Sequence, residues 1–205
     1  IADRMNRMMN ISKWTFMTLA LALFLVGFAS CGESIPKPRG YFRIDLPEKE
    51  YARYENEQFP CRFDYAGNVS TVNFVKVSND SAWVDIVYPK YNAKIYCTYK
   101  ELSGDFQKVS EESRKLVYKP HTVKADAITE QAYLNDESRV YGILYELKGN
   151  TASNIQFVLS DSTKHFLRGA LYFNVNPNKD SIAPVVDYIR EDIIRLVETL
   201  EWSKK

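Results

Sequence analysis

Apolar and polar residues alternate along most of the chain between residues 69 and 175, which is the period of a half-buried β-strand. Turn-forming residues divide this region into segments that we predict to be strands. The predicted strands are 69–77, 82–88, 93–99, 126–133, 139–148, 154–160 and 165–175. Most connections between them have hairpin length, and hairpins join antiparallel neighbours. The pattern therefore predicts a largely antiparallel sheet.

The first of two interruptions in this alternation is residues 105–118, where apolar side chains recur at helical spacing. The residues predicted to share one face of this helix are Phe106, Val109, Ser113, Leu116 and Val117. Proline disfavours a helix interior, so we expect Pro120 to end the helix.

The second interruption, residues 180–200, has the clearest helical pattern in the chain. Asp180 or Ser181 can cap it, and Glu191 with Arg195 is spaced for an ion pair on the outer face. The predicted apolar stripe is Val185, Val186, Ile189, Ile193, Leu196, Val197 and Leu200. Trp202 is expected to tuck under the end of this helix. Together the segments predict an α+β domain, with a largely antiparallel sheet and helices on its faces.

The N-terminal residues have the order of an export signal. Basic residues up to Lys13 precede an uncharged run over 14–28, which ends in the small residues Ala29 and Ser30. A retained transmembrane helix is the alternative, but the run is short of the about 20 apolar residues that a span needs. We therefore predict a signal peptide over residues 1–30 that is removed on export.

Cys31 follows the small residues directly, and this order resembles the lipobox of bacterial lipoproteins, although Phe28 stands where the pattern prefers leucine. The resemblance implies that Cys31 becomes the N-terminus and carries diacylglycerol, with palmitate-type acyl chains that hold it in a membrane. Residues 31–37 would then form a lipidated tether, and residues 38–205 a single globular domain.

Cys61 and Cys97 are the cysteines that remain after Cys31 is assigned to lipid. An exported protein meets a space that permits disulfides, and a bridge would close a loop of about 37 residues, worth roughly 3–4 kcal/mol. Two separate buried thiols, acting as small apolar residues, are the alternative. Sequence alone leaves both open.

Residues that would support catalysis are sparse. His121 and His165 lie in different elements, with no partner at metal-ligand spacing, and the glycines do not form a phosphate-binding loop. The signatures of serine and zinc hydrolases are absent from the sequence. We therefore expect no catalytic residues, no metal and no cofactor. The formal net charge of +1 argues against a nucleic-acid binder, which would need a basic face.

The segment 36–47 carries three prolines, three cations and two aromatics next to the predicted tether. Its prolines favour an extended conformation that could pair with a partner strand. The candidate partner-binding residues are Arg39, Tyr41 and Arg43. In the alternative, the segment only covers the domain's own core, through Phe42, Ile44 and Leu46.

Several stretches of the chain carry a resemblance to a known family. They are residues 36–47, 124–126 with 130–131, 140–142, 153–157, 164–166 and 176–181. They resemble the gliding-motility lipoprotein GldD family of Bacteroidota, and the similarity runs over nearly the whole chain, from the signal peptide to Trp202. The resemblance implies a non-enzymatic envelope component needed for gliding and for type IX secretion. The order of strands and helices also resembles the Mog1/PsbP-type sandwich, a fold used as a binding adaptor.

Three tripeptides resemble the Asp-Ser/Thr-aliphatic/Thr sites at which Bacteroidota attach O-glycans to exported proteins. Their serines are Ser81, Ser162 and Ser181. A glycan needs an exposed position. Ser81, in a predicted turn, meets this need best, because Ser181 is a candidate helix cap.

The favoured function is an accessory or assembly-stabilising subunit that binds other envelope proteins of the motility and secretion apparatus. A periplasmic lipoprotein that binds a small ligand or glycan is the alternative. A deep apolar pocket would favour the ligand, and a flat aromatic-rich surface would favour protein partners. Gly32 stands where inner-membrane lipoproteins of enterobacteria carry aspartate, so we expect an outer-membrane anchor that faces the periplasm.

Overall fold

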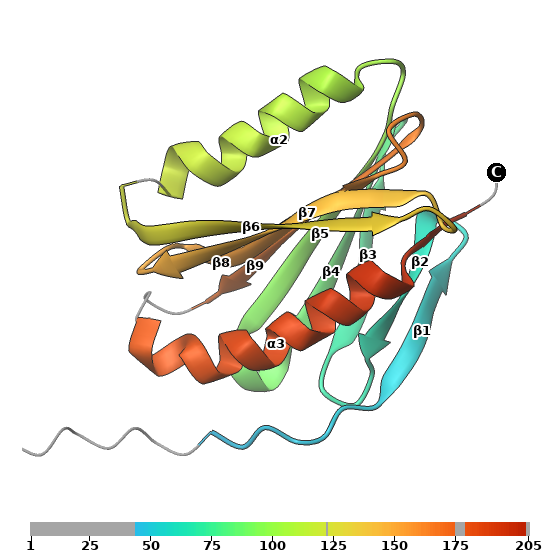
Figure 1. Ribbon diagram of the computed structural model, residues 1–205. Coiled ribbons are helices and arrows are strands. Elements are labelled where there is room, and N and C mark those ends of the chain that lie inside the picture. The colour runs from blue at the N-terminus through green and yellow to red at the C-terminus, as the bar shows by residue number, and fades with distance from the viewer. Residues whose placement is uncertain (1–43, 122, 175–178, 204–205) are drawn as a thin grey trace, which may run out of the picture. The chain divides into compact units, whose positions relative to one another are not determined.

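The described part of the chain, residues 44–121, 123–174 and 179–203, contains two antiparallel sheets and the two helices α2 (Phe106–His121) and α3 (Lys179–Thr199). All of it belongs to the unit Phe42–Lys205. Figure 1 shows α2 on one face of the large sheet, and α3 with the small sheet on the other face. The predicted α+β class with antiparallel sheets is confirmed.

The large sheet has the strand order β3-β4-β5-β9-β8-β7-β6, and every neighbouring pair is antiparallel. Its strands are β3 (Thr71–Val77), β4 (Ser81–Tyr88), β5 (Ala93–Glu101), β6 (Ala125–Asn135), β7 (Val140–Gly149), β8 (Ser153–Ser160) and β9 (His165–Phe173). A short 3-10 helix, η1 (Pro89–Tyr91), joins β4 to β5. These are the seven strands that the alternation of apolar residues predicts, with ends shifted by a few residues.

The small sheet has the order β1-β2-β10 and was not predicted. Its strands are β1 (Tyr51–Asn56), β2 (Phe59–Ala66) and β10 (Glu201–Trp202). In β2 the buried residues Phe59, Cys61 and Phe63 alternate with half-buried ones, but Pro60 interrupts the pattern in the sequence. Trp202 packs partly buried against the main core just after the last helix, and its backbone forms a strand beside Cys61 that was not predicted.

The main core lies between α3, β2 and the facing side of the large sheet. Six of the seven residues of the predicted α3 stripe are buried, and Val186 is partly buried against the same core. β4 and β5 supply alternate residues to this core, among them Val84, Ile86 and Ile95. These contacts hold α3 and the small sheet together as one layer.

α2 packs on the opposite side of the large sheet, where Val117 contacts a cluster with Tyr145 and Leu147 of β7. Two predictions for this helix were wrong. Leu116 is 54% exposed, so it does not share the buried face. The helix also continues through Pro120 to His121, since a proline this close to the end removes only one hydrogen bond of the last turn.

Among the described helices, none combines the length and the apolar composition that crossing a membrane requires.

Candidate functional site

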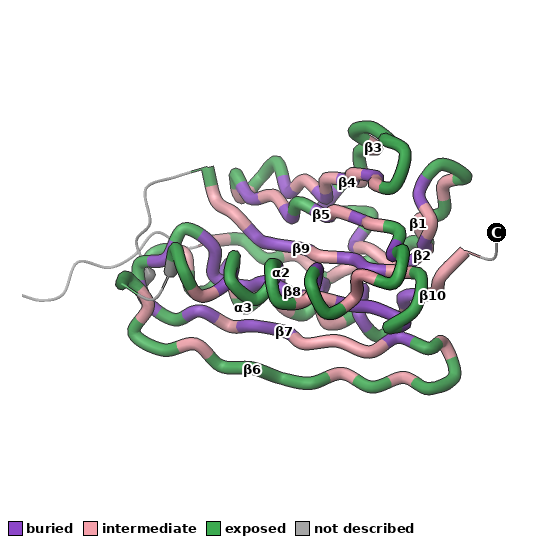
Figure 2. Tube along the Cα trace, turned by 90° about the horizontal axis from the view of Figure 1, so that it is seen from above, coloured by how far each residue is buried: buried purple, intermediate pink, exposed green. Residues whose placement is uncertain are grey.

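The described elements leave one half of the large sheet uncovered on the side that carries α2. The cross-strand register places Trp83, Thr98, Arg168, Val158 and Ile143 in one row across β4, β5, β9, β8 and β7. Val158 and Ile143 pack in the clusters beneath α2. Figure 2 shows β3 and β4 beside α2 rather than beneath it. The row therefore begins at Trp83, which α2 does not cover, and ends at Ile143 beneath α2.

We call the uncovered part the open face. It consists of the residues of β3, β4, β5 and β9 that alternate with the core residues and that no described element covers. They are Asn73, Lys76, Trp83, Asp85, Lys94, Tyr96, Thr98, Arg168 and Tyr172.

Aromatic rings and cations interleave on the open face. The Lys76 ammonium lies 4.4 Å from the centroid of the Trp83 ring, and the Lys94 ammonium lies 5.1 Å from that of Tyr96. Tyr96 also meets Tyr172 edge to face, at 5.7 Å between centroids, and stays 46% exposed. Cations attracted to ring faces in this way form a surface that is both aromatic and positive.

The lysines nearest the carboxylates of this region are paired. Lys94 contacts Asp85 at 3.1 Å, and the hydrogen bond from this pair raises the pKa of Lys94. Lys100, at the margin of the open face, contacts Asp105 at 3.2 Å. Lys94 on the open face and Lys100 at its margin are therefore both neutralised within the domain.

Arg168 is not satisfied in this way. Its Nη2 donates to Oε1 of the fully buried Gln156 at 2.6 Å, while its buried Nε has no hydrogen-bond partner. Burial lowers the pKa of Arg168 from its ordinary value, although a guanidinium stays charged at neutral pH. Within the described residues, neither Arg168 nor Lys76 pairs with a carboxylate.

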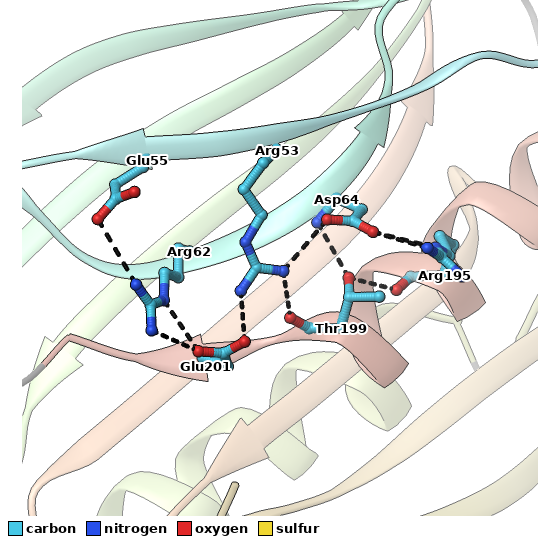
Figure 3. A network of polar contacts seen from close by, with 7 residues as sticks. All are labelled: Arg53, Glu55, Arg62, Asp64, Arg195, Thr199 and Glu201. Atoms are coloured by element: carbon cyan, nitrogen blue, oxygen red, sulfur yellow. Dashed lines mark hydrogen bonds and ion pairs between the residues drawn. The ribbon is translucent and has the colours of Figure 1, made fainter.

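The opposite side of the molecule carries a set of ion pairs that join the small sheet to α3, shown in Figure 3. We call it the fastening network, and its members are Arg53, Glu55, Arg62, Asp64, Arg195, Thr199 and Glu201. Arg53 reaches Asp64 at 3.1 Å and Glu201 at 2.7 Å, and Arg62 reaches Glu201 at 2.6 Å. Each arginine in it has a carboxylate of the same domain.

Arg195 contacts Asp64 at 2.8 Å, and Glu191 contacts Lys49 at 3.0 Å. The predicted pair between Glu191 and Arg195 along the helix was therefore wrong. Partners from β2 and from the segment before β1 replace it, because both lie against the outer side of α3.

A buried charge pair fixes the segment before β1 to α3. Lys49 and Asp192 lie 2.9 Å apart, with side chains only 7% and 2% exposed. Tyr51 and Tyr88 donate their hydroxyls to Asp192 at 2.9 and 3.0 Å, and burial together with this carboxylate raises the pKa of both. Tyr188 donates to the carbonyl of Pro47 at 2.6 Å. These contacts are internal and leave no group free for a ligand.

A polar cavity of about 910 Å³ lies where β9 begins and β10 ends, lined by Arg139, Lys164, His165 and Trp202 among others. The His165 ring stacks on Trp202 at 5.0 Å, and its Nδ1 shares a hydrogen bond with the Tyr99 hydroxyl at 2.8 Å. Burial lowers the pKa of His165. In the described residues, no group of three His, Cys, Asp or Glu side chains is placed to hold a metal ion.

Four of the predicted site residues, Cys31, Arg39, Tyr41 and Arg43, lie outside the described residues. The alternative, that segment 36–47 only covers the domain's own core, can be examined only from Ile44 onward. There Ile44 packs against the main core, while Leu46 is 37% exposed.

The three serines of the predicted glycan sites differ in exposure. Ser81 is half-buried as the first residue of β4 and donates to Asp80, so it is not the most exposed of them. Ser162 and Ser181 are exposed. Ser162 lies in the β8–β9 turn with a φ of 64°, after Asp161. Exposure therefore favours Ser162 over Ser81.

Cys61 and Cys97 are free, fully buried thiols in the main core. Burial raises the pKa of Cys97 to about 12 and that of Cys61 well above its ordinary value, so neither thiol is reactive in the fold. Labelling with iodoacetamide after unfolding without reductant separates the two alternatives. Free thiols would both be modified, whereas a disulfide would protect both.

The open face was not predicted as a site. Its residues are single members of ordinary strands, and the lone signal in the sequence is Arg168, a charge within the apolar strand β9. Only the strand register brings Arg168 into line with Trp83 and Thr98.

The fold and the site together define an α+β sandwich domain. On one side of its large sheet, half of the face is not covered by any described element and carries aromatic and cationic side chains. A family model described as the gliding motility lipoprotein GldD matches residues 31–202, and the chain belongs to this family. The family places the protein among lipoproteins of gliding motility, anchored by lipid in the cell envelope. A comparison with curated proteins found no match.

Proposed function

We propose that the protein is a non-catalytic accessory subunit that binds another envelope protein of the gliding-motility and type IX secretion apparatus. Cys31 anchors it through diacylglycerol to the periplasmic side of the outer membrane. The family match, which begins at Cys31, supports a lipoprotein of the motility apparatus. The binding surface that we assign is the open face.

The observation that carries this proposal is a half-sheet that no described element covers and that carries the exposed Tyr96 with the half-buried Trp83 and Tyr172. An antiparallel sheet can leave one face to solvent, and such a face ordinarily carries small polar and charged side chains, whereas this one gathers aromatic rings and cations. Tyrosine, tryptophan and arginine are enriched where protein interfaces concentrate their binding energy. The open face supplies all three in Trp83, Tyr96, Tyr172 and Arg168.

A non-catalytic role is supported by the way the polar residues are used. Asp85, Asp161 and Asp192 accept hydrogen bonds or ion pairs from within the domain. The buried thiols have raised pKa values, unlike the activated cysteines of enzymes. Assay of the purified protein against general esterase, phosphatase and glycosidase substrates should give no turnover above the background rate.

The binding surface can be tested by affinity purification of the full-length, lipidated chain from membranes. The double variant Trp83→Ala with Tyr96→Ala should lose the envelope partner identified with the wild type, and secretion should fall. A matched control replaces Leu134 and Val123, which are 79% and 92% exposed but lie outside the open face. The proposal fails if both double variants keep the partner, or if both lose it.

The anchor can be tested separately. Cys31→Ser should abolish incorporation of a fatty-acid analogue and release the protein from the membrane fraction. Persistence of the label on the serine variant would refute lipidation at this residue.

A small-ligand-binding function is the second candidate, favoured by one cavity of about 370 Å³ beside α3. Apolar residues such as Ile155 and Val186 line it, and Asn154 contributes a buried Oδ1 without a partner. Native mass spectrometry of protein purified from its own membranes tests this function. A bound mass that disappears in Asn154→Leu would support it, whereas an unliganded mass would reject it.

A further inference from the structure

We infer that the partner binds the open face through an acidic segment, with one carboxylate seated on Arg168 and a second near Lys76. This inference rests on the proposed function and adds the chemistry of the partner.

The state of Arg168 is the first argument. A charge removed from water is costly unless it is paired, and here the guanidinium is held by a neutral amide while its Nε has no partner. An arginine has five N–H donors in a fork that matches a carboxylate. The hydrogen bond to Gln156 offsets part of the free energy lost by burying this cation, and a carboxylate at the guanidinium would offset more.

The position of Arg168 is the second argument. Its neighbour Val158 on β8 packs beneath α2, whereas its neighbour Thr98 on β5 lies on the open face. The guanidinium thus stands at the border between the covered and uncovered halves of the sheet. On the uncovered side Asp85, the carboxylate of this face, is already engaged by Lys94.

The charge of the face is the third argument. Lys76, Lys94 and Arg168 lie on it with Asp85, so the cations exceed the carboxylates. Lys94 and Asp85 neutralise each other, which leaves Lys76 and Arg168 in excess. A partner of complementary charge is acidic.

The spacing of the two cations suggests the form of the segment. Lys76 and Arg168 stand three strands apart in the same row, which corresponds to about 14 Å. An extended chain covers that distance in about four residues, and residues four positions apart point to the same side. Two carboxylates four positions apart on an extended segment therefore fit both cations.

The aromatic residues favour a protein over a glycan. A sugar ring stacks on the free face of an aromatic side chain, but lysine ammonium groups already lie over the rings of Trp83 and Tyr96. The edge of Tyr96 or Tyr172 is further engaged in their mutual contact. These rings offer little free surface to a sugar, whereas Lys76, above the Trp83 ring, is available to a carboxylate.

The test uses a fluorescently labelled Gly-Ser peptide that carries two glutamates four positions apart, and measures the anisotropy of its fluorescence as the full-length chain in detergent is added. The wild type should bind this peptide and not its lysine counterpart, and 0.5 M salt should weaken binding because it screens the charges. Arg168→Gln should weaken it about ten-fold or more. Arg168→Lys keeps the charge but lacks the forked N–H donors of arginine. It should bind the peptide more weakly than the wild type and more tightly than Arg168→Gln.

The matched control is Arg114→Gln, which removes the same charge from an exposed arginine on α2 that lies near Glu130 rather than on the open face. It should bind the peptide as the wild type does. Circular dichroism and thermal melting of each variant confirm that it is folded. If Arg168→Gln does not fold, Lys76→Gln replaces it and should weaken binding by a smaller factor.

Three outcomes would overturn the inference. Peptide binding that is unchanged in both Arg168→Gln and Lys76→Gln would refute the contact between the carboxylates and these two cations. Equal binding of the lysine peptide would remove the charge complementarity. Binding of dextran sulfate without binding of the glutamate peptide would assign the face to a polyanionic glycan.

Failure of the inference can be told from failure of the proposed function. If Arg168→Gln keeps the envelope partner while the Trp83 and Tyr96 double variant loses it, protein binding stands and the acidic chemistry is wrong. If both keep it, the open face is not the binding surface.

Discussion

The two sides of the large sheet use charged residues in opposite ways. On the side of α3 and the small sheet, Arg53 and Arg62 find carboxylates of the same domain, and the buried Lys49 is paired with Asp192. On the open face Arg168 is held by an amide, and no carboxylate of the described residues pairs with it. The first arrangement completes the fold, whereas the second leaves binding capacity for another molecule.

This difference separates the charged residues that stabilise the domain from those that are available to bind another molecule. Replacing a charge that is paired inside the fold leaves its partner unpaired, so stability falls. Replacing a charge that no carboxylate of the domain pairs with leaves no charge stranded and removes a desolvated group, so stability changes little. Four substitutions test the contrast.

Asp192→Ala should give the largest effect, a loss of about 3–5 kcal/mol in the free energy of unfolding, because it strands the buried ammonium of Lys49. It also removes the acceptor of the Tyr51 and Tyr88 hydroxyls. Urea denaturation measures the loss. Asp187→Ala, an exposed aspartate of the same helix, is the control and should change stability by less than about 0.5 kcal/mol. Similar losses in both variants would contradict the contrast.

Asp161→Ala should cost about 2 kcal/mol at pH 7. Burial raises the pKa of Asp161, but backbone hydrogen bonds from His165, Lys164 and Thr163 outweigh it and lower the pKa to about 2. A carboxyl with a lowered pKa contributes stability that is complete above its ordinary pKa and is lost as pH falls. The gap between wild type and variant should therefore close between about pH 4 and pH 2. A gap that is constant over this range would show that the charge is unimportant.

Arg62→Gln should cost less, about 1 kcal/mol or below, since its ion pair with Glu201 is 43% exposed on both sides and screened by solvent. The loss should shrink further in 0.5 M salt. Thermal melting at two salt concentrations measures it. A salt-independent loss above about 2 kcal/mol would mean that packing of the side chain, not its charge, is what matters.

Arg168→Gln should have the smallest effect on stability, between no change and a slight gain, although it removes the same charge as Arg62→Gln. The Oε1 of the buried Gln156 loses a donor, but no carboxylate of the described residues loses a partner and a desolvated guanidinium disappears, so the opposing effects leave stability nearly unchanged. Comparing the urea midpoints of the two variants side by side gives the result. If Arg168→Gln is the more damaging of the pair, Arg168 is a structural residue.

The elements with strong periodicity could be predicted from the sequence. The α3 stripe built on Val185, Ile189 and Ile193 and the alternation of β4 and β5 are confirmed, because each repeats a burial pattern over several turns or residues. β2 has the same alternation, but Pro60 and the flanking charges hide it. β10 is two residues long and exists only because β2 lies beside it.

The candidate site could not be predicted, since it depends on where α2 crosses the sheet. Leu116 shows that helical spacing does not determine whether a single residue is buried. Its helical spacing matches that of Val109 and Val117, yet the helix presents it to solvent. Arg168 could be recognised as unusual in an apolar strand, but its lack of a carboxylate follows from strand register, which joins residues about 70 positions apart.

The contacts of the segment before β1 also determine how the domain would respond to mechanical force. A pull on the chain ahead of Ile44 reaches α3 through the Lys49–Asp192 pair and the Tyr188 hydrogen bond to Pro47, and it reaches η1 through the Lys90 contact with Asp45. These contacts lie within a few residues of each other, so they share the tension instead of breaking one at a time. In a lipid-anchored protein, tension from the anchor would thereby be transmitted to α3, and the edge strands of the sheets would carry less of it.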